Sequence, residues 1–258
     1  MSQQLKCKDW YLSERDVDMY NEFEKRYLDI PRKIFLEIAL SLLPYPTHKI
    51  LDIGCGTGSG VKYIKSRLGK VKITAIDPSA AMLKMANDNV SDVKFINVSI
   101  EDCQDDEKYD LILSYSNLRL WKDPVKAFKN ISQMLTPHGL AYILDLRGDS
   151  EEIKEIVLQN SEVEFRDFLK DQLSMAYKRN DLEHFLSLAE IKNFEIKVGG
   201  LGGCPSNSPE AFALIQQNEH LAKIIFDKEK GRFSSSKLAE SVFHIFIRKE
   251  DCHEAGRS

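Results

Sequence analysis

Apolar residues of this chain recur at helical spacing near the N-terminus and are then gathered into short runs. Within residues 31–43 they share one helical face, with Pro31 suited to the first turn and Pro44 to the end. From residue 48 onward, runs of five to eight mostly apolar residues alternate with amphipathic segments of about ten to thirteen. This alternation predicts repeated β–α–β units and a parallel sheet covered on both faces.

Seven of the short apolar runs have the length and composition of buried strands. They are residues 48–54, 71–77, 93–98, 109–114, 139–146, 194–200 and 242–248. Amphipathic helical patterns fill residues 59–69, 78–89, 123–135, 150–176 and 180–190. The fold class is therefore α/β, a doubly wound, mostly parallel, seven-stranded Rossmann-like sheet with N-terminal helices and a C-terminal helical insertion.

The same pattern divides the chain into segments. We expect an N-terminal helical leader or cap at 1–44, an α/β core at 45–201, an insertion at 202–240, a final strand at 241–249 and a tail at 250–258. The insertion is too long for a hairpin and has apolar residues that must pack on something. It is predicted to be a lid over the pocket, with a dimer contact as the alternative, so the chain is a monomer or a homodimer.

Composition and charge narrow the function. The 258 residues are 43% hydrophobic and 29% charged, with a net charge of −4. The basic excess that nucleic-acid binding usually needs is absent, so a nucleic-acid partner is disfavoured. Five cysteines without a CxxC pair argue against a disulfide framework or a metal site and favour a cytoplasmic location. No signal peptide and no membrane-spanning run is evident.

A glycine-rich motif carries the strongest chemical signal. Asp52 ends a predicted strand, and glycines follow at 54, 56, 58 and 60 before a predicted helix. Such a turn lets the backbone approach a ligand closely, beside the unpaired N–H groups of the helix. The dinucleotide fingerprint G-x-G-x-x-G fails here because Ser59 stands at its last position. A ligand-free turn is the alternative, but it needs fewer glycines.

Asp77 is the second signal. It ends the second predicted strand, 19 residues after Gly58. In open α/β folds a carboxylate at this place accepts hydrogen bonds from ribose hydroxyl groups. Asp77 could also simply cap the following helix, and the two roles are compatible.

Three stretches together resemble one known family. LDIGCGTGSG, AIDPSAAML and YDLILSYSNLRLWKDPVKAFKNISQMLTPHGLAYILDLRGD resemble the class I S-adenosylmethionine (SAM)-dependent methyltransferases, most closely their small-molecule branch, over about residues 45–200. The resemblance implies SAM as the cofactor and residues 242–248 as a final antiparallel strand. It implies that the methionine part of SAM is surrounded by Asp52, Gly54, Cys55, Gly56 and Gly58.

The resemblance also implies roles for residues nearer the ribose, the adenine and the sulfonium. Asp77 would hold the ribose, while Pro78 and Ser79 would flank the adenine. Ser99, Ile100, Glu101 and Asp102 would meet the adenine edge, and Ser114 and Tyr115 would lie near the sulfonium. Many relatives have Asp where Ser99 stands, so either Ser99 itself would accept the hydrogen bond, more weakly, or Glu101 or Asp102 would substitute for it.

Candidates for the acceptor side come from the N-terminal helix and two loops. Tyr20, and Tyr11 before it, lie where relatives often carry a tyrosine that closes over the cofactor. Arg119 and Arg147 follow predicted strands at the carboxyl rim, where ligands bind, and would favour an acidic acceptor. The alternatives are a solvent-exposed Arg119 and an ion pair of Arg147 with Asp145.

The predicted activity is methyl transfer from SAM to a small molecule, with S-adenosylhomocysteine (SAH) as product. No fixed catalytic dyad is expected, because methyl transfer mainly requires alignment and exclusion of water. The alternatives are a methyltransferase acting on RNA or protein and a non-catalytic SAM-binding protein. The loop Ser114–Asn117 lacks the prolines of base-methylating enzymes, which disfavours a flipped base as the acceptor.

Overall fold

A computed structural model describes residues 14–43, 47–159, 161–200, 208–217, 226–227, 232–233 and 240–249. Tyr11 lies outside these residues, as do most of the predicted insertion at 202–240 and all of the tail at 250–258. Among the described helices, none is long and apolar enough to cross a membrane.

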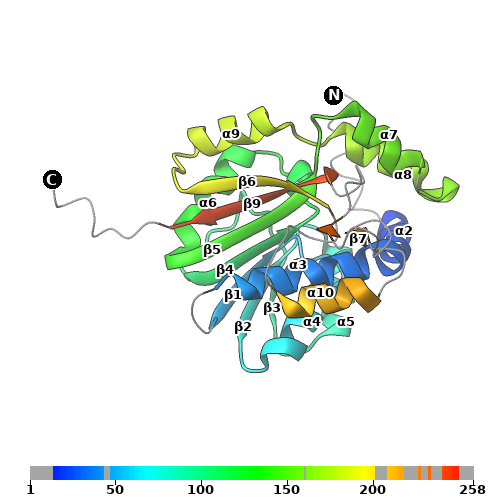
Figure 1. Cartoon of the computed structure of the whole chain (residues 1–258). Coiled ribbons are helices and arrows are strands. Elements are labelled where there is room, and N and C mark those ends of the chain that lie inside the picture. The colour runs from blue at the N-terminus through cyan, green and yellow to red at the C-terminus, as the bar shows by residue number, and fades with distance from the viewer. Residues whose placement is uncertain are drawn as a thin grey trace.

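The core is a seven-stranded sheet (Figure 1). Its spatial order is β3 (Lys94–Ile96), β2 (Lys72–Ile76), β1 (Lys49–Ile53), β4 (Tyr109–Tyr115), β5 (Leu135–Leu146), β9 (Val242–Arg248) and β6 (Phe194–Gly199). The pairs from β3 to β5 are parallel, and β9 runs antiparallel to both β5 and β6. The predicted fold class is confirmed, including the antiparallel final strand.

Helices cover both faces of this sheet, which explains why its central strands are almost wholly buried. One apolar cluster joins the sheet to α3 (Asp29–Ser41) and α4 (Ser59–Leu68), and the other joins it to α6 (Pro124–Met134) and α9 (Arg179–Leu188). The ends of the helices follow local rules. Gly69 ends α4 at a φ of +62°, and the Ser79 hydroxyl caps α5 (Ala80–Asn89) by accepting from the Met82 N–H.

The N-terminal helix is longer than the sequence pattern predicted. Helical backbone runs through α2 (Glu14–Phe23), a π-helical turn η2 (Glu24–Leu28) and α3. The expectation that the helix begins at Pro31 is therefore wrong, although Pro31 does lie in the first turn of α3. A helical leader was expected over 1–44, but without bounds for its helices, because polar residues dominate the part before Pro31.

A second helical group packs on this N-terminal segment. It comprises α7 (Glu151–Gln159), the short η4 (Val163–Phe165) and α8 (Arg166–Ser174). The Phe23 ring lies 5.3 Å from the rings of both Phe165 and Phe168, and Arg26 pairs with Glu164 at 2.6 Å. Figure 1 shows α2 and α8 side by side, near the end of the sheet to which β5 runs.

The described parts of the predicted insertion are a helix and a small strand pair, β7 (Phe226–Asp227) with β8 (Arg232–Phe233). The helix, α10 (Pro209–Gln217), lies along α3 and buries Ala211 and Ile215 in the cluster on that face (Figure 1). No residue of α10 lines the cavity described below. Whether the insertion forms a lid or a dimer contact stays a prediction.

Candidate active site

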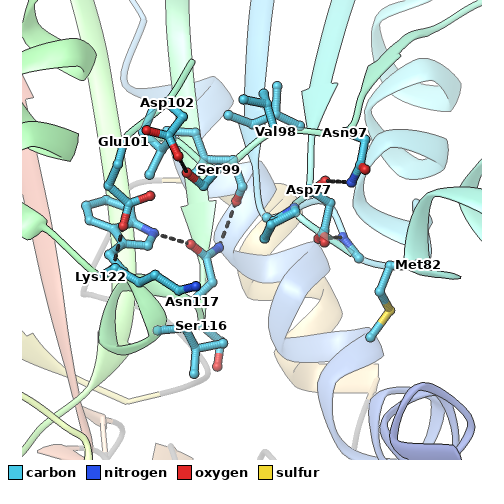
Figure 2. Close-up of a pocket in the computed structure, with 18 of the residues that line it drawn as sticks. Asp77, Met82, Asn97, Val98, Ser99, Glu101, Asp102, Ser116, Asn117 and Lys122 are labelled. Atoms are coloured by element: carbon cyan, nitrogen blue, oxygen red, sulfur yellow. Dashed lines mark hydrogen bonds between the residues drawn. The ribbon is translucent and has the colours of Figure 1, made fainter. Parts of the chain in front are cut away.

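A cavity of about 430 Å³ opens at the carboxyl ends of β1, β2 and β4 (Figure 2). This is the edge of an open α/β sheet where ligands bind, and the volume is in the range of small-molecule sites. The predicted residues that line it are Tyr20, Gly54, Gly56, Asp77, Pro78, Ser99, Ile100, Glu101, Asp102, Tyr115 and Arg119. Five predicted cofactor residues, Asp52, Cys55, Gly58, Ser79 and Ser114, lie outside this lining, as does Arg147.

The glycine-rich loop forms one wall of the cavity. Gly54, Gly56 and Gly58 have φ angles of +66°, +54° and +79°, a region that side chains with a Cβ rarely adopt. The N–H groups of Gly54 and Cys55 donate to the Ile76 carbonyl at 2.8 and 3.1 Å, which holds the loop against β2. Gly58 and Cys55 thus shape the loop from behind the lining rather than facing the cavity.

Gly54→Ala tests how tightly this loop is packed. A Cβ at Gly54 would lie 2.6 Å from the Asn117 amide nitrogen, whereas one at Gly69, also at positive φ, would meet nothing within 4 Å. We expect Gly54→Ala to lower the melting temperature clearly more than Gly69→Ala, because both carry backbone strain but only one carries the clash. Thermal unfolding of the two variants measures this. Equal losses would show that Asn117 moves aside freely.

Asp77 faces the cavity from the end of β2. Its Oδ2 accepts from the Gly56 N–H at 2.9 Å and its Oδ1 accepts from the Ser79 N–H at 2.8 Å. Burial raises the pKa of this carboxyl to about 6, against the lowering effect of these two hydrogen bonds. Each oxygen keeps a second lone pair, so the carboxylate can brace the glycine-rich loop and still accept hydrogen bonds from a ligand.

Asp52 lies beneath the loop rather than in the lining. Burial raises the pKa of this carboxyl to about 7, against the lowering effect of the nearby Arg32 guanidinium, and Asp77 raises it further. Asp52 and Asp77 are thus two neighbouring carboxyls whose ionisation the fold opposes. A cationic ligand would favour their charged forms.

Asp52→Asn should change how stability depends on pH. Burial raises the pKa from 3.8 to about 7, so folding takes up a proton between these values, and the free energy of unfolding falls as the pH rises through them. We expect the asparagine variant to melt at a higher temperature than the wild type at pH 8, with the difference vanishing near pH 4. Calorimetric melting at both pH values measures this. A lower melting temperature at pH 8 would contradict it.

Two carboxylates, those of Glu101 and Asp102, lie on the predicted adenine side, and they make different contacts. The Glu101 carboxylate is buried and accepts from the backbone N–H groups of Lys122 and Asp123 at 2.5 and 3.2 Å. The Asp102 carboxylate is exposed and accepts from the Ser99 hydroxyl at 3.1 Å (Figure 2). Glu101 therefore holds the loop before α6, and Asp102 is the better placed of the two to meet a ligand edge.

At the end of β4, alternate residues face opposite sides of the sheet. Ser114 is fully buried and donates to the Asn117 side chain at 3.0 Å. Its place near the sulfonium stays a prediction. Tyr115 lines the cavity, with its ring 5.2 Å from that of Phe35 and 5.2 Å from the Arg32 guanidinium. Its buried hydroxyl has no hydrogen-bond partner among the described residues.

Asn117 was not identified as a candidate from the sequence, yet its side chain connects the end of β1 with the loop after β4. Its amide nitrogen donates to the Ile53 carbonyl at 2.7 Å, and its carbonyl accepts from the Trp121 indole at 2.8 Å (Figure 2). No local sequence signal marks this role, because Ile53 lies at the end of another strand, far from Asn117 in the chain.

Arg119 borders the cavity but is not the exposed loop residue that the sequence left open. Its side chain is 5% exposed and pairs with Asp145 at 2.5 Å, while its Nε donates to Gln172 at 2.9 Å. The sequence alternative of an Asp145–Arg147 pair is thereby corrected, because β5 points Asp145 at the loop after β4. Arg147 instead pairs with Asp149 and Glu240.

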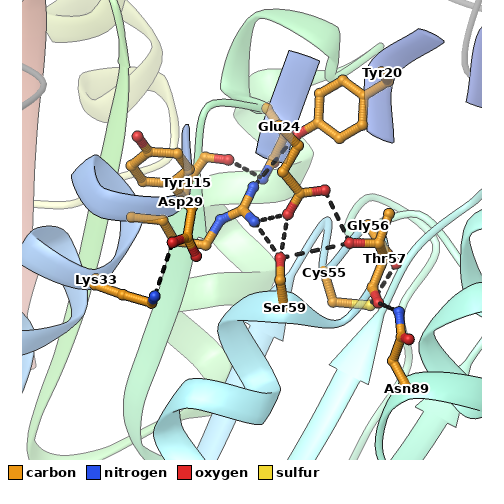
Figure 3. A network of polar contacts seen from close by, with 12 residues as sticks. Tyr20, Glu24, Asp29, Lys33, Cys55, Gly56, Thr57, Ser59, Asn89 and Tyr115 are labelled. Carbon is orange, nitrogen blue, oxygen red and sulfur yellow. Dashed lines mark hydrogen bonds and ion pairs between the residues drawn. The ribbon is translucent and has the colours of Figure 1, made fainter. Parts of the chain in front are cut away.

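A buried network below the glycine-rich loop was also missed. Arg32 of α3 donates to Glu24 of η2 and to the Ser59 hydroxyl, and Thr57 donates to Glu24 at 2.8 Å (Figure 3). In a straight α-helix, residues eight apart lie about 80° apart around the axis. The wider π-helical turn between Glu24 and Arg32 reduces this offset. Sequence periodicity alone gives no sign of that turn.

The chain has the glycine-rich loop, the acidic residue after β2 and the seven-stranded sheet that its resemblance to the class I SAM-dependent methyltransferases implies. In agreement, residues 50–139 match the family model described as a methyltransferase domain. The resemblance inferred from the sequence is confirmed for this segment, which holds the loop, Asp77 and the β4 rim.

Relatives of known name match parts of the chain. A malonyl-[acyl-carrier protein] O-methyltransferase of Acetivibrio thermocellus is 36% identical over 93 residues, covering 35% of this chain and 33% of its own. A trans-aconitate 2-methyltransferase of Escherichia coli is 26% identical over 129 residues, half of each chain. The match thus spans half or less of these relatives.

Among solved structures, the plantazolicin methyltransferase BamL, in complex with a substrate analogue and SAH, has the same fold. The TM-score is 0.72 at 23% sequence identity, and the match covers 96% of both chains. The likeness therefore extends over the helices at both ends of the core.

Proposed function

We propose that this protein transfers a methyl group from SAM to a small-molecule acceptor and releases SAH. The observation that carries the proposal is that Gly54, Gly56 and Asp77 line one cavity at the carboxyl end of the sheet. The methyltransferase-domain match over residues 50–139 and the SAH-bound structural neighbour support it.

The residues present fit SAM. Gly54 and Gly56 have no side chains, so the methionine part of SAM could lie directly against their backbone. The Asp77 carboxylate has lone pairs that could accept hydrogen bonds from the ribose hydroxyls. Pro78, Ser99, Ile100 and Asp102 border the space for the adenine, and Tyr20 and Tyr115 border the opposite part. When bound, SAM supplies an electrophilic methyl group on a positively charged sulfur.

The task left to the protein is to align the acceptor and exclude water. Burial raises the pKa of Tyr115 far above neutrality, so its hydroxyl stays protonated and acts as a hydrogen-bond donor, not as a base. Among the described residues no histidine lines the cavity. This arrangement suits an acceptor that is nucleophilic without a dedicated general base.

The acceptor's charge is a narrower question. Arg119 carried the expectation of an acidic acceptor, but Asp145 neutralises it. The lining carries Asp77, Glu101 and Asp102 against Arg119 and Lys122, unlike the basic groove that RNA methylation favours. We therefore propose a small acceptor, and we do not propose that it carries a carboxylate. A cytoplasmic location stays a prediction from the sequence.

Calorimetry with SAM, SAH and NAD tests the proposal. We expect binding of SAM and SAH in the micromolar range and no measurable binding of NAD. Incubation with methyl-labelled SAM and a panel that includes trans-aconitate and neutral alcohols and amines would then identify the acceptor class. Binding of NAD without binding of SAM or SAH would refute the proposal.

A further inference from the structure

Glu24 is a buried carboxylate with donors from two separate segments. It lies in the π-helical turn η2, is 3% exposed, and accepts from Arg32, from the Thr57 hydroxyl at 2.8 Å and from the Ser59 hydroxyl (Figure 3). A buried charge is costly unless it is paired and hydrogen-bonded, so these contacts hold their segments together. Through Glu24, the N-terminal helix is fastened to the glycine-rich loop.

On the loop side, the attachment lies directly behind the cavity wall. Thr57 and Ser59 flank Gly58, immediately after Gly54 and Gly56, which line the cavity. Thr57 itself is buried and does not line it. Asp77 and the Ile76 carbonyl hold the first part of the loop from the β2 side, and Glu24 holds its later part, at Thr57 and Ser59, from the side of the N-terminal helix.

On the helix side, the same network reaches two further residues that line the cavity. The Arg32 guanidinium lies within 3.4 Å of the Tyr20 hydroxyl and 5.2 Å from the Tyr115 ring. Both tyrosines line the cavity, and Tyr20 lies one helical turn before Glu24. Glu24 is thus connected both to the glycine-rich loop and, through Arg32, to two tyrosines that line the cavity.

We propose that Glu24 is a positioning residue of the SAM site. Through Thr57 and Ser59 it fixes the conformation of the glycine-rich loop, and through Arg32 it fixes Tyr20, so that the N-terminal helix and the cofactor stabilise each other. This inference rests on the proposed function, because it takes SAM and SAH as the ligands of the cavity.

Thr57 offers a matched pair of variants that leaves the Glu24–Arg32 pair intact. Thr57→Val keeps the shape and removes the hydroxyl, whereas Thr57→Ser keeps the hydroxyl. By titration calorimetry, below the melting temperature of each protein, we expect SAH affinity to fall about tenfold in Thr57→Val and to stay within about twofold of wild type in Thr57→Ser. Equal affinity in all three proteins, or equal losses in both variants, would overturn the proposal.

Glu24→Gln tests the carboxylate itself, with Glu22→Gln as its control. Glu22 is exposed on the same helix and pairs only with Lys25 at the surface among the described residues. We expect a loss of SAH affinity of tenfold or more in Glu24→Gln and none in Glu22→Gln. If Glu24→Gln does not fold, the Thr57 pair decides.

Hydrogen exchange separates positioning from a purely structural role. In the wild type, SAH should slow amide exchange across residues 17–28, and this protection should be largely lost in Thr57→Val. A variant that melts earlier but binds SAH normally, or a wild type whose helix exchanges equally with and without SAH, would overturn the inference. A wild type that does not bind SAH at all would instead refute the proposed function.

Discussion

Asp77→Ala should weaken SAH binding by about tenfold to hundredfold. Removing hydrogen bonds to a charged group costs about 1.5–3 kcal/mol, and the carboxylate faces the cavity with lone pairs to spare. Its loss would also leave the Gly56 N–H without its present partner, which loosens the loop. Titration calorimetry with SAH measures the change.

Ser79→Ala is the control that separates ribose binding from helix capping. The Ser79 hydroxyl caps α5 but lies outside the cavity lining. Its removal should cost about 1 kcal/mol of stability, typical of an N-cap, and leave SAH affinity unchanged. If Asp77→Ala behaves in the same way, with normal SAH binding, then Asp77 serves the fold alone.

Arg119→Ala should be the most destabilising of the substitutions considered. It leaves Asp145 buried without its cationic partner and removes the donors to Gln172 and to the Ser116 carbonyl. Breaking a buried ion pair from one side typically costs about 3–5 kcal/mol. Chemical denaturation measures the free energy of unfolding.

Two variants bracket this result. Arg147→Ala removes a more exposed arginine of the same rim and should cost much less. The double variant Arg119→Ala/Asp145→Ala should recover part of the loss, because no unpaired charge remains. A stable Arg119→Ala protein with impaired acceptor kinetics alone would instead favour the acceptor-binding role inferred from the sequence.

Local patterns in the sequence predicted most of the framework. The seven strands of the main sheet and the helices α4, α5, α6 and α9 were located within a few residues, because burial on both faces of a parallel sheet leaves continuous apolar runs. The short strands β7 and β8, which lie inside the predicted insertion, were not located. Gly54 and Asp77 were also identified from local sequence patterns. A tight turn and a strand end are defined by neighbours in the chain, so their residues carry the signal directly.

The partners of polar side chains could not be predicted in this way. Arg119 was read as a loop residue, but the parallel pairing of β4 with β5 carries Asp145 to it. The sequence also gave no sign that the Glu101 carboxylate accepts from the backbone of the loop before α6. Each pairing depends on the register of elements far apart in the chain, which periodicity does not specify.

The N-terminal helix shows most clearly which features follow from the local sequence and which depend on tertiary contacts. Its amphipathic pattern predicted a helix over residues 31–43, of which 31–41 are helical, and it predicted which face is buried. Only the tertiary structure decided that the helix continues back to Glu14, that a π-helical turn interrupts it, and that Glu24 and Arg32 meet beneath the glycine-rich loop. The physical reason is that backbone periodicity is a local property of the sequence, whereas a buried charge is stable only where distant segments supply its partners.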